Sequence, residues 1–256
     1  MTERPETLHR GAAPASPAFT LLELIVVIAI VALLMAILVP GLSHARAAMR
    51  TTACASNTRQ MSMALQMYRD ESDGWIFPLR KSLAASGTLW WFGFEAAGGP
   101  KAEGSRILDR TRGRLWPYYQ ASDSIEICPA FALDSGHYKP KYTTNWTTYG
   151  HPLSLMNPAA PVRTGDIERP GDTVAFADSA QINFFQAPAS PNHPMFEQWY
   201  YISRLERTVH YVHGGRANAS MYDGHVRMLD PQFGVSSLFP EAPVGRPPSD
   251  VVIGVP

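Results

Sequence analysis

The sequence predicts an α+β protein in which one long N-terminal helix packs against a small antiparallel sheet. Two observations lead to this fold class. An apolar run near the N-terminus passes directly into an amphipathic helical pattern, and the chain beyond residue 75 consists of short apolar stretches separated by Gly and Pro turn signals. The 256 residues suffice for one sizeable domain and a membrane segment.

Charge and composition narrow the range of partners. Lys+Arg and Asp+Glu both number 22, and a net charge of zero gives no reason to expect a nucleic acid partner. Charged residues make up only 17% of the chain, which is low for a fully solvated protein. We therefore expect part of the chain to lie in lipid or in a protein interface.

Residues 19–39 form an apolar run in which Glu23 is the only charged residue, and they follow the polar, Pro- and Ala-rich residues 1–18. At a rise of ~1.5 Å per residue this run spans about 30 Å, the thickness of a bilayer core. A transmembrane anchor explains the length. A secretory signal peptide explains the position, with Ala45-Arg46-Ala47 as its small-x-small cleavage site. Neither explains Glu23, because an unpaired carboxylate is costly in lipid.

The stretch Phe19-Thr20-Leu21-Leu22-Glu23-Leu24 resembles the prepilin peptidase motif of type IV pilins and type II secretion pseudopilins. The resemblance implies that residues 1–18 are a leader, that cleavage falls between Ala18 and Phe19, and that the new Phe19 amine is N-methylated. The family usually has Gly before the cut, whereas this chain has Ala18. Pro40 stands where the family often has a helix-kinking proline.

Glu23 would be the fifth residue of the mature chain, and it has a physical role in this interpretation. Cleavage exposes a positive amine on Phe19, and the Phe19 amine of a neighbouring subunit is a natural partner for a buried Glu23. Such a buried charge pair fixes register more than it adds stability. The alternative is that the Glu23 side chain snorkels to the membrane interface.

Residues 40–72 are expected to continue the helix in amphipathic form. Cys54, Met61, Leu65 and Tyr68 fall on one stripe at helical spacing, which predicts a face that packs on a sheet. By the resemblance, the first half of this helix is transmembrane and forms the core of a filament, and the second half supports an extracytoplasmic domain.

Residues 73–239 are expected to form that globular domain, with short strands. The candidate strands are Ser124–Cys128, Thr173–Ala177, Trp199–Leu205, Ala217–Tyr222 and His225–Leu229. Asp223-Gly224 joins the last two as a hairpin turn, because this dipeptide between such runs is a strong hairpin signal. Residues 240–256 contain five prolines, and we expect an extended, poorly packed tail.

Aromatic side chains gather in four short segments of the globular part. These segments are residues 75–77, 89–94, 116–119 and 199–201. They are interpreted as the core and its rim. A face that binds carbohydrate or a protein partner is the alternative.

The two cysteines, Cys54 and Cys128, suggest one disulfide in an exported chain, with two unrelated buried thiols as the alternative. Cys54 precedes Asn57-Thr58-Arg59-Gln60, and Cys128-Pro129 follows later, which resembles one pilin-like subgroup. The resemblance implies a bridge that joins the helix to the domain.

His213, nine further residues and Asp223-Gly224 resemble the H-x9-DG segment of the same subgroup. The upstream segment 169–179, which reads as a strand ending at Asp178, resembles its companion. The similarity therefore touches both ends of the chain, with a variable middle between them.

His210, His213, Asp223 and His225 are a candidate ligand set for Zn²⁺ or another divalent metal, with Asp178 as a further carboxylate. A water in an open position would make this a hydrolase site. No Ser or Cys nucleophile motif and no Gly-rich phosphate loop accompanies the set. The structural alternative is that His213 bonds to Asp223 or Asp178 and pins the hairpin that turns at Gly224. We expect this alternative, with no metal, no cofactor and no catalysis.

The sequence thus predicts a structural subunit of a type IV pilus or a type II secretion pseudopilus, held in the inner membrane with its domain in the periplasm. The resemblance implies three partners: prepilin peptidase, other subunits through the N-terminal helix, and inner-membrane lipid. One alternative is a pilin-anchored surface protein that binds glycans without polymerising. Another is an exported metal-dependent hydrolase that uses the four candidate ligands.

Overall fold

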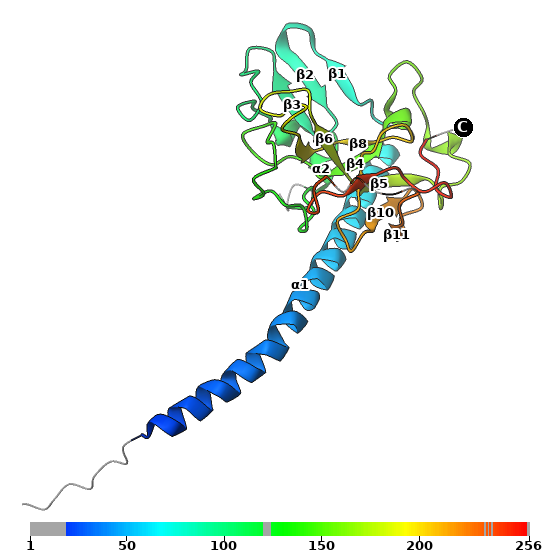
Figure 1. The fold of residues 1–256 in the computed structure, drawn as a ribbon. Helices are drawn as coiled ribbons and strands as arrows, with labels where there is room; N and C mark the ends of the chain where they lie inside the picture. Colours follow the sequence, from blue (N-terminus) through cyan, green and yellow to red (C-terminus); the bar gives the residue numbers. More distant parts are fainter. Residues whose placement is uncertain (1–18, 120–123, 233, 235, 237, 255–256) are drawn as a thin grey trace, which may run out of the picture. The chain divides into compact units, whose positions relative to one another are not determined.

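The computed structural model describes residues 19–119, 124–232, 234, 236 and 238–254 (Figure 1). The expected leader, residues 1–18, lies outside the described residues, so the cleavage expected after Ala18 stays a prediction. The chain divides into two compact units, which meet between Ala45 and Arg46.

Helix α1 (Leu21–Glu71) is continuous, as the two joined sequence patterns predict. It begins with a capping box, in which the Glu23 amide donates to Thr20 Oγ1 (3.2 Å) and the Thr20 amide donates to Glu23 Oε2 (2.8 Å). It ends before Gly74, which has a left-handed φ of 78° and whose amide donates to the Arg69 carbonyl (2.8 Å). The helix continues through Pro40 without interruption.

The first unit contains the apolar part of α1. Its large apolar side chains between Phe19 and Val39 are all exposed, and the least exposed of them, Val31, still shows 46% of its surface. Among the described residues, α1 is the one helix long and apolar enough to cross a membrane. An apolar surface of this length is unfavourable in water, and it fits a single membrane span or a signal sequence.

A five-stranded sheet forms the centre of the second unit, with the strand order β11-β10-β5-β4-β8. Its strands are β4 (Tyr149–Pro152), β5 (Val174–Asp178), β8 (Tyr201–Ile202), β10 (Ala217–Met221) and β11 (Val226–Leu229). Strands β10 and β11 form the expected hairpin around Asp223 and Gly224, in which Gly224 has a φ of 92°. Four of the five candidate strands are therefore found, three close to their expected bounds and one, β8, in part.

Smaller sheets and short helices surround the central sheet. One small sheet is three-stranded, and the other two are strand pairs. Their elements are β1 (Arg80–Ser82), β2 (Gly87–Trp90), β3 (Gly93–Ala96), β6 (Ala180–Asn183), β7 (Met195–Gln198), β9 (Val209–His210), β12 (Val244–Gly245) and the short helix α2 (Trp116–Tyr119).

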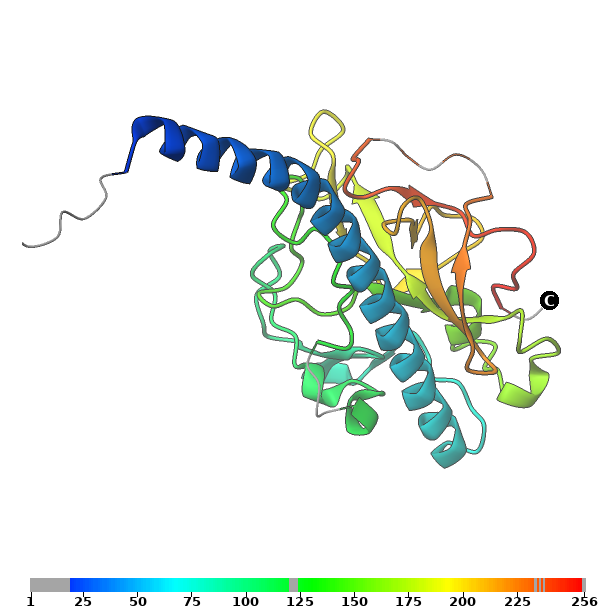
Figure 2. The same ribbon diagram turned by 90° about the horizontal axis from the view of Figure 1, so that it is seen from below.

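The second half of α1 packs on strands β5 and β10 (Figure 2). Met61 and Leu65, on the predicted stripe, are 0% and 1% exposed. Ser62 Oγ donates to the Met221 carbonyl (3.2 Å), and Asn218 Nδ2 donates to the Thr51 carbonyl (3.1 Å). A long N-terminal helix packed on a sheet confirms the α+β class.

The sheet differs from the expectation in being mixed, because β8 runs parallel to β4 while the other pairs are antiparallel. Residues 124–128 form turns rather than a strand, and Ile125 and Cys128 are buried there without strand pairing. A short apolar run cannot distinguish a strand from a buried turn, since both hide two or three side chains.

The Pro-rich C-terminal segment is also a correction, because its described residues 240–254 are packed against the domain. Val244 lies in β12 and pairs with His210, and Val251 is fully buried. Thr173, which immediately precedes β5, forms an isolated β-bridge with Val252. Proline density predicted a lack of regular structure, but it carried no information about these long-range contacts.

The aromatic segments lie mainly in the core. Trp91 and Phe92 are at most 1% exposed, and the Phe92 ring packs on the buried Trp146 outside these segments, with 4.6 Å between ring centroids. Trp75 is exposed at the surface, where the Arg163 guanidinium stacks on its ring. These placements support the core interpretation of the aromatic segments.

Replacing Leu65 by Ala should destabilise the second unit by about 2–5 kcal/mol, because it leaves a cavity between α1 and the sheet. Met63→Ala on the exposed face of the same helix, where Met63 is 49% exposed, should cost less than about 0.5 kcal/mol. Urea unfolding of the full chain in detergent, followed by tryptophan fluorescence, measures both. Equal effects would contradict the docking of this helix face.

Candidate functional site

Four side chains able to bind a metal converge where α1 meets the sheet. They are Cys54, Cys128, Asp178 and His213, and one potential ligand atom from each lies within 4.8 Å of all the others. We call these four residues the buried cluster. The residues are at most 6% exposed, so the cluster lies in the interior of the second unit.

Each member comes from a different segment of the chain. Cys54 lies on the buried stripe of α1, and Asp178 is the last residue of β5. The Cys128 amide donates to Thr148 Oγ1 (2.6 Å), which fixes the turn that carries this thiol. His213 precedes Gly214-Gly215, whose φ angles of 64° and 84° form a tight turn closed by the Arg216 amide and the His213 carbonyl.

Short contacts join the members of the buried cluster. Cys54 Sγ donates to Asp178 Oδ1 (2.9 Å), and Asp178 Oδ2 lies 3.3 Å from His213 Nε2. His213 Nε2 also lies 3.4 Å from Cys128 Sγ. The imidazole Nε2 therefore sits between the carboxylate and the second thiol.

A second layer of polar groups surrounds the cluster. The Asn218 amide donates to Asp178 Oδ2 (2.7 Å), and Tyr149 OH donates to Cys54 Sγ (3.4 Å). Thr51 Oγ1 lies 3.1 Å from His213 Nδ1, the ring nitrogen that points away from the cluster. These contacts fix the orientation of the carboxylate, one thiol and the imidazole.

Burial and hydrogen bonding set the charge of the cluster in the absence of any ion. Burial is the main cause that raises the pKa of both the Cys54 and the Cys128 thiol, so both are protonated at neutral pH. Burial opposes a charged His213, but its contact with Asp178 raises its pKa to about 10. His213 is then an imidazolium that faces the Asp178 carboxylate.

The structure places the H-x9-DG residues in two different environments. His213 contacts Asp178 in the interior, which is one of the two partners expected for it. Asp223 lies in the hairpin turn, where its Oδ1 accepts from the His225 amide (3.1 Å) and lies 2.7 Å from His225 Nδ1. Both of these side chains are more than 40% exposed.

The four candidate ligands from the sequence do not come together within the described residues. His210 is fully buried with its ring 5.2 Å from that of Phe131, and burial lowers its pKa to about 4. Asp223 and His225 pair with each other at the surface, and only His213 belongs to the buried cluster. The hydrolase alternative therefore loses its ligand set.

Sequence reasoning missed the association of the cysteines with His213 and Asp178. It suggested a disulfide between Cys54 and Cys128, with two unrelated buried thiols as the alternative; in the structure both are free thiols in one cluster. The disulfide stays a prediction. The available signal was the presence of two thiols, one histidine and one strand-end aspartate in motifs of the same subgroup.

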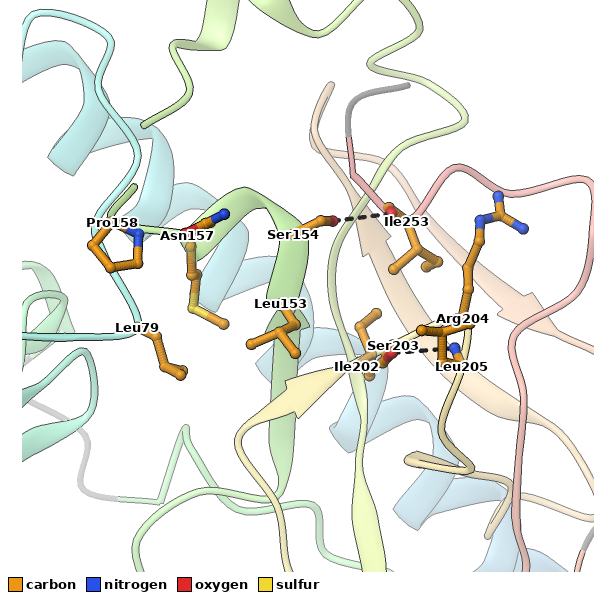
Figure 3. A pocket seen from close by; sticks show the side chains of 11 residues that line it. Leu79, Leu153, Ser154, Asn157, Pro158, Ile202, Ser203, Arg204, Leu205 and Ile253 are labelled. Carbon is orange, nitrogen blue, oxygen red and sulfur yellow. Dashed lines mark hydrogen bonds between the residues drawn. The ribbon is translucent and has the colours of Figure 1, made fainter. Parts of the chain in front are cut away.

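A surface cavity of about 470 Å³ lies beside β8, an edge strand of the central sheet, and the C-terminal segment at Ile253. Figure 3 shows Leu79, Leu153 and Ile202 along it, with Ser154 Oγ bonded to the Ile253 carbonyl (3.1 Å). The residues that line it include no histidine, cysteine or acidic residue. This cavity is a mainly apolar recess with Arg204 as its one charged lining residue.

In the first unit, Glu23 and Phe19 lie at the exposed end of α1. Glu23 Oε2 accepts from both the amide and the hydroxyl of Thr20, each at 2.8 Å. Phe19 is 71% exposed. The expected assembly residues are therefore accessible to a neighbouring molecule.

Comparison with protein-family models, with curated proteins and with solved structures gives no match. The class of protein therefore follows from the architecture, which is pilin-like: one long N-terminal helix is apolar in its first part and carries a β-rich domain on its second part.

In the ion-free protein, Asp178→Asn should destabilise the second unit by about 3–5 kcal/mol, because it removes the charge that faces a buried imidazolium. Asp223→Asn is the matched control, and its effect should stay below about 1 kcal/mol because its histidine partner is exposed. Urea unfolding of both variants in detergent measures the difference. Similar small effects would show that the Asp178 contacts contribute little.

Proposed function

We propose that this protein is a filament subunit of the type IV pilin or type II secretion pseudopilin class. The observation that carries the proposal is the division of α1 at one position along its length. Residues 19–39 form an apolar run in which Glu23 is the one charged residue, whereas the second half is docked on a domain. A helix of this kind suits a hydrophobic filament core with the domain on the surface.

The position of Glu23 supports assembly through the first unit. All other residues from 19 to 39 are uncharged and give a helix bundle few features that define register. One buried charge pair between Glu23 and the Phe19 amine of the next subunit would select a single axial offset. The Thr20 capping box holds the carboxylate at the first turn, close to the end where that amine would lie.

The contacts of the second half of α1 support a role in transmitting force from the helix to the domain. Apolar packing at Met61 and Leu65 is combined with hydrogen bonds from Ser62 to β10 and from Asn218 to the helix. Force applied along a filament core would therefore pass from the helix directly into the central sheet.

The same reasoning favours a non-enzymatic role. The cavity in Figure 3 is lined without histidine, cysteine or acidic side chains, and the described pocket that borders the buried cluster has a volume of only about 150 Å³. We therefore propose a structural subunit that is processed by prepilin peptidase and resides in the inner membrane before assembly. Its partners would be other subunits and membrane lipid, with the domain in the periplasm.

The mature protein should begin with N-methylated Phe19. Intact mass of the protein isolated from its native membrane should show the loss of residues 1–18 and the gain of one methyl group. A mass that instead corresponds to the loss of residues 1–47 would identify a secretory signal peptide and contradict the filament proposal.

Glu23→Ala should lower incorporation into filaments at least about tenfold, because coupling between close buried charges amounts to about 1.5 kcal/mol or more. The variant should remain in the membrane with a folded domain. Thr20→Ala is the matched control, since it removes the capping hydroxyl and keeps the carboxylate. Sheared filament fractions quantified by immunoblot measure both variants, and equal losses would mean that Glu23 acts only as a helix cap.

A further inference from the structure

We propose that the buried cluster is a structural Zn²⁺ site, with Cys54, Cys128, Asp178 and His213 as the four ligands. This site goes beyond the proposed filament role, because neither the apolar helix nor Glu23 requires it. Two thiolates, one imidazole and one carboxylate are ligands that Zn²⁺ accepts in tetrahedral sites. Of the four candidate ligands from the sequence, the site contains His213, whereas His210, Asp223 and His225 lie outside it.

The separations between potential ligand atoms are close to those of a tetrahedral zinc site. Metal–ligand bonds of about 2.0–2.3 Å place neighbouring ligand atoms roughly 3.3–3.8 Å apart. The observed separations are 3.4 Å from Cys128 Sγ to His213 Nε2 and 3.3 Å from His213 Nε2 to Asp178 Oδ2. The contact between Cys54 and Asp178, at 2.9 Å, needs to open by a few tenths of an ångström.

The polar groups around the cluster match what metal ligands require. A zinc-bound histidine usually bonds through its other ring nitrogen, and His213 Nδ1 has Thr51 Oγ1 at 3.1 Å. The Asn218 amide holds Asp178 Oδ2, and Tyr149 OH donates to Cys54 Sγ. Donors of this kind stabilise the negative charge of a carboxylate and a thiolate.

A disulfide explains the same four residues less well. It would use only the two sulfurs and would remove the thiol hydrogen that Cys54 donates to Asp178 Oδ1. That would leave one oxygen of a fully buried carboxylate without this donor, which is costly in the interior. A bound Zn²⁺ instead takes the place of the thiol protons and of the proton between Asp178 and His213, and these protons leave to the solvent.

The site is closed and therefore structural. All four positions of a tetrahedral ion would be taken by protein atoms, which leaves none for a substrate or a reactive water. A small cavity of about 150 Å³ borders His213, with Thr51 and Gly214 among its lining residues, and it offers a path for an ion. The ion would join α1, the turn at Cys128, the end of β5 and the loop that carries His213.

The test uses the full chain, purified in detergent without a polyhistidine tag. Elemental analysis should find about one zinc ion per chain, and both thiols should become accessible to a thiol reagent only after chelation. Removal of zinc should lower the unfolding temperature by roughly 5–10 °C, and its return should restore the original value. Mg²⁺ added in place of zinc is the inert comparison. Co²⁺ in place of zinc should give thiolate charge-transfer absorption.

Variants assign the ligands. Cys128→Ala and His213→Ala should lose the bound zinc, and His225→Ala, an exposed histidine of the same region, should keep it. The metal-exchange measurements on the unsubstituted protein decide the matter if a ligand variant fails to fold. A protein that binds no zinc after reduction and incubation with the ion would overturn the proposal. So would a native mass that reveals a Cys54–Cys128 disulfide, or zinc retained in His213→Ala.

Discussion

The rest of the second unit depends on the docking of α1 on strands β5 and β10. The helix supplies an apolar stripe from Met61 to Leu65, and the sheet supplies strands that are buried on both faces. In the five-stranded sheet, β11 pairs with β10 and β4 pairs with β5, so the other strands of this sheet are joined to the helix through β5 and β10. The polar groups at this contact are bonded across it, so separation of helix and sheet would expose several buried donors and acceptors at once.

Away from this contact, buried ion pairs hold segments that have little regular structure. Lys139 is completely buried, and its Nζ lies 2.6 Å from Glu103 and 2.8 Å from Glu197 of β7. Arg110 and Tyr119 both bond to the buried Glu126, with distances of 2.6 Å and 2.5 Å. Breaking such a pair costs more than the pair contributes, which makes these loops resistant to local rearrangement. A domain rich in Gly and Pro is thereby ordered through side chains.

The sequence predicted those features that local patterns define. The 3.6-residue period placed Cys54 and Leu65 on one buried face, and Asp223-Gly224 marked the hairpin. The packing of Val244 against β9 was not predictable, because proline content describes only the local backbone. The meeting of Cys54 with His213 was equally hidden, since residues 159 positions apart are brought together by strand order rather than by spacing.

The capping box at Thr20 changes how the charge of Glu23 should be understood. The spacing of Thr20 and Glu23 is a readable helix-start signal, but an interpretation based on intersubunit pairing passed over it. A single helix satisfies the carboxylate locally, and such a cap contributes about 1 kcal/mol. An amine of a neighbouring subunit can approach the same oxygens without breaking the cap, because an ionised carboxylate accepts several hydrogen bonds. The cap therefore orients the carboxylate before assembly, and this lowers the entropy lost when the charge pair forms.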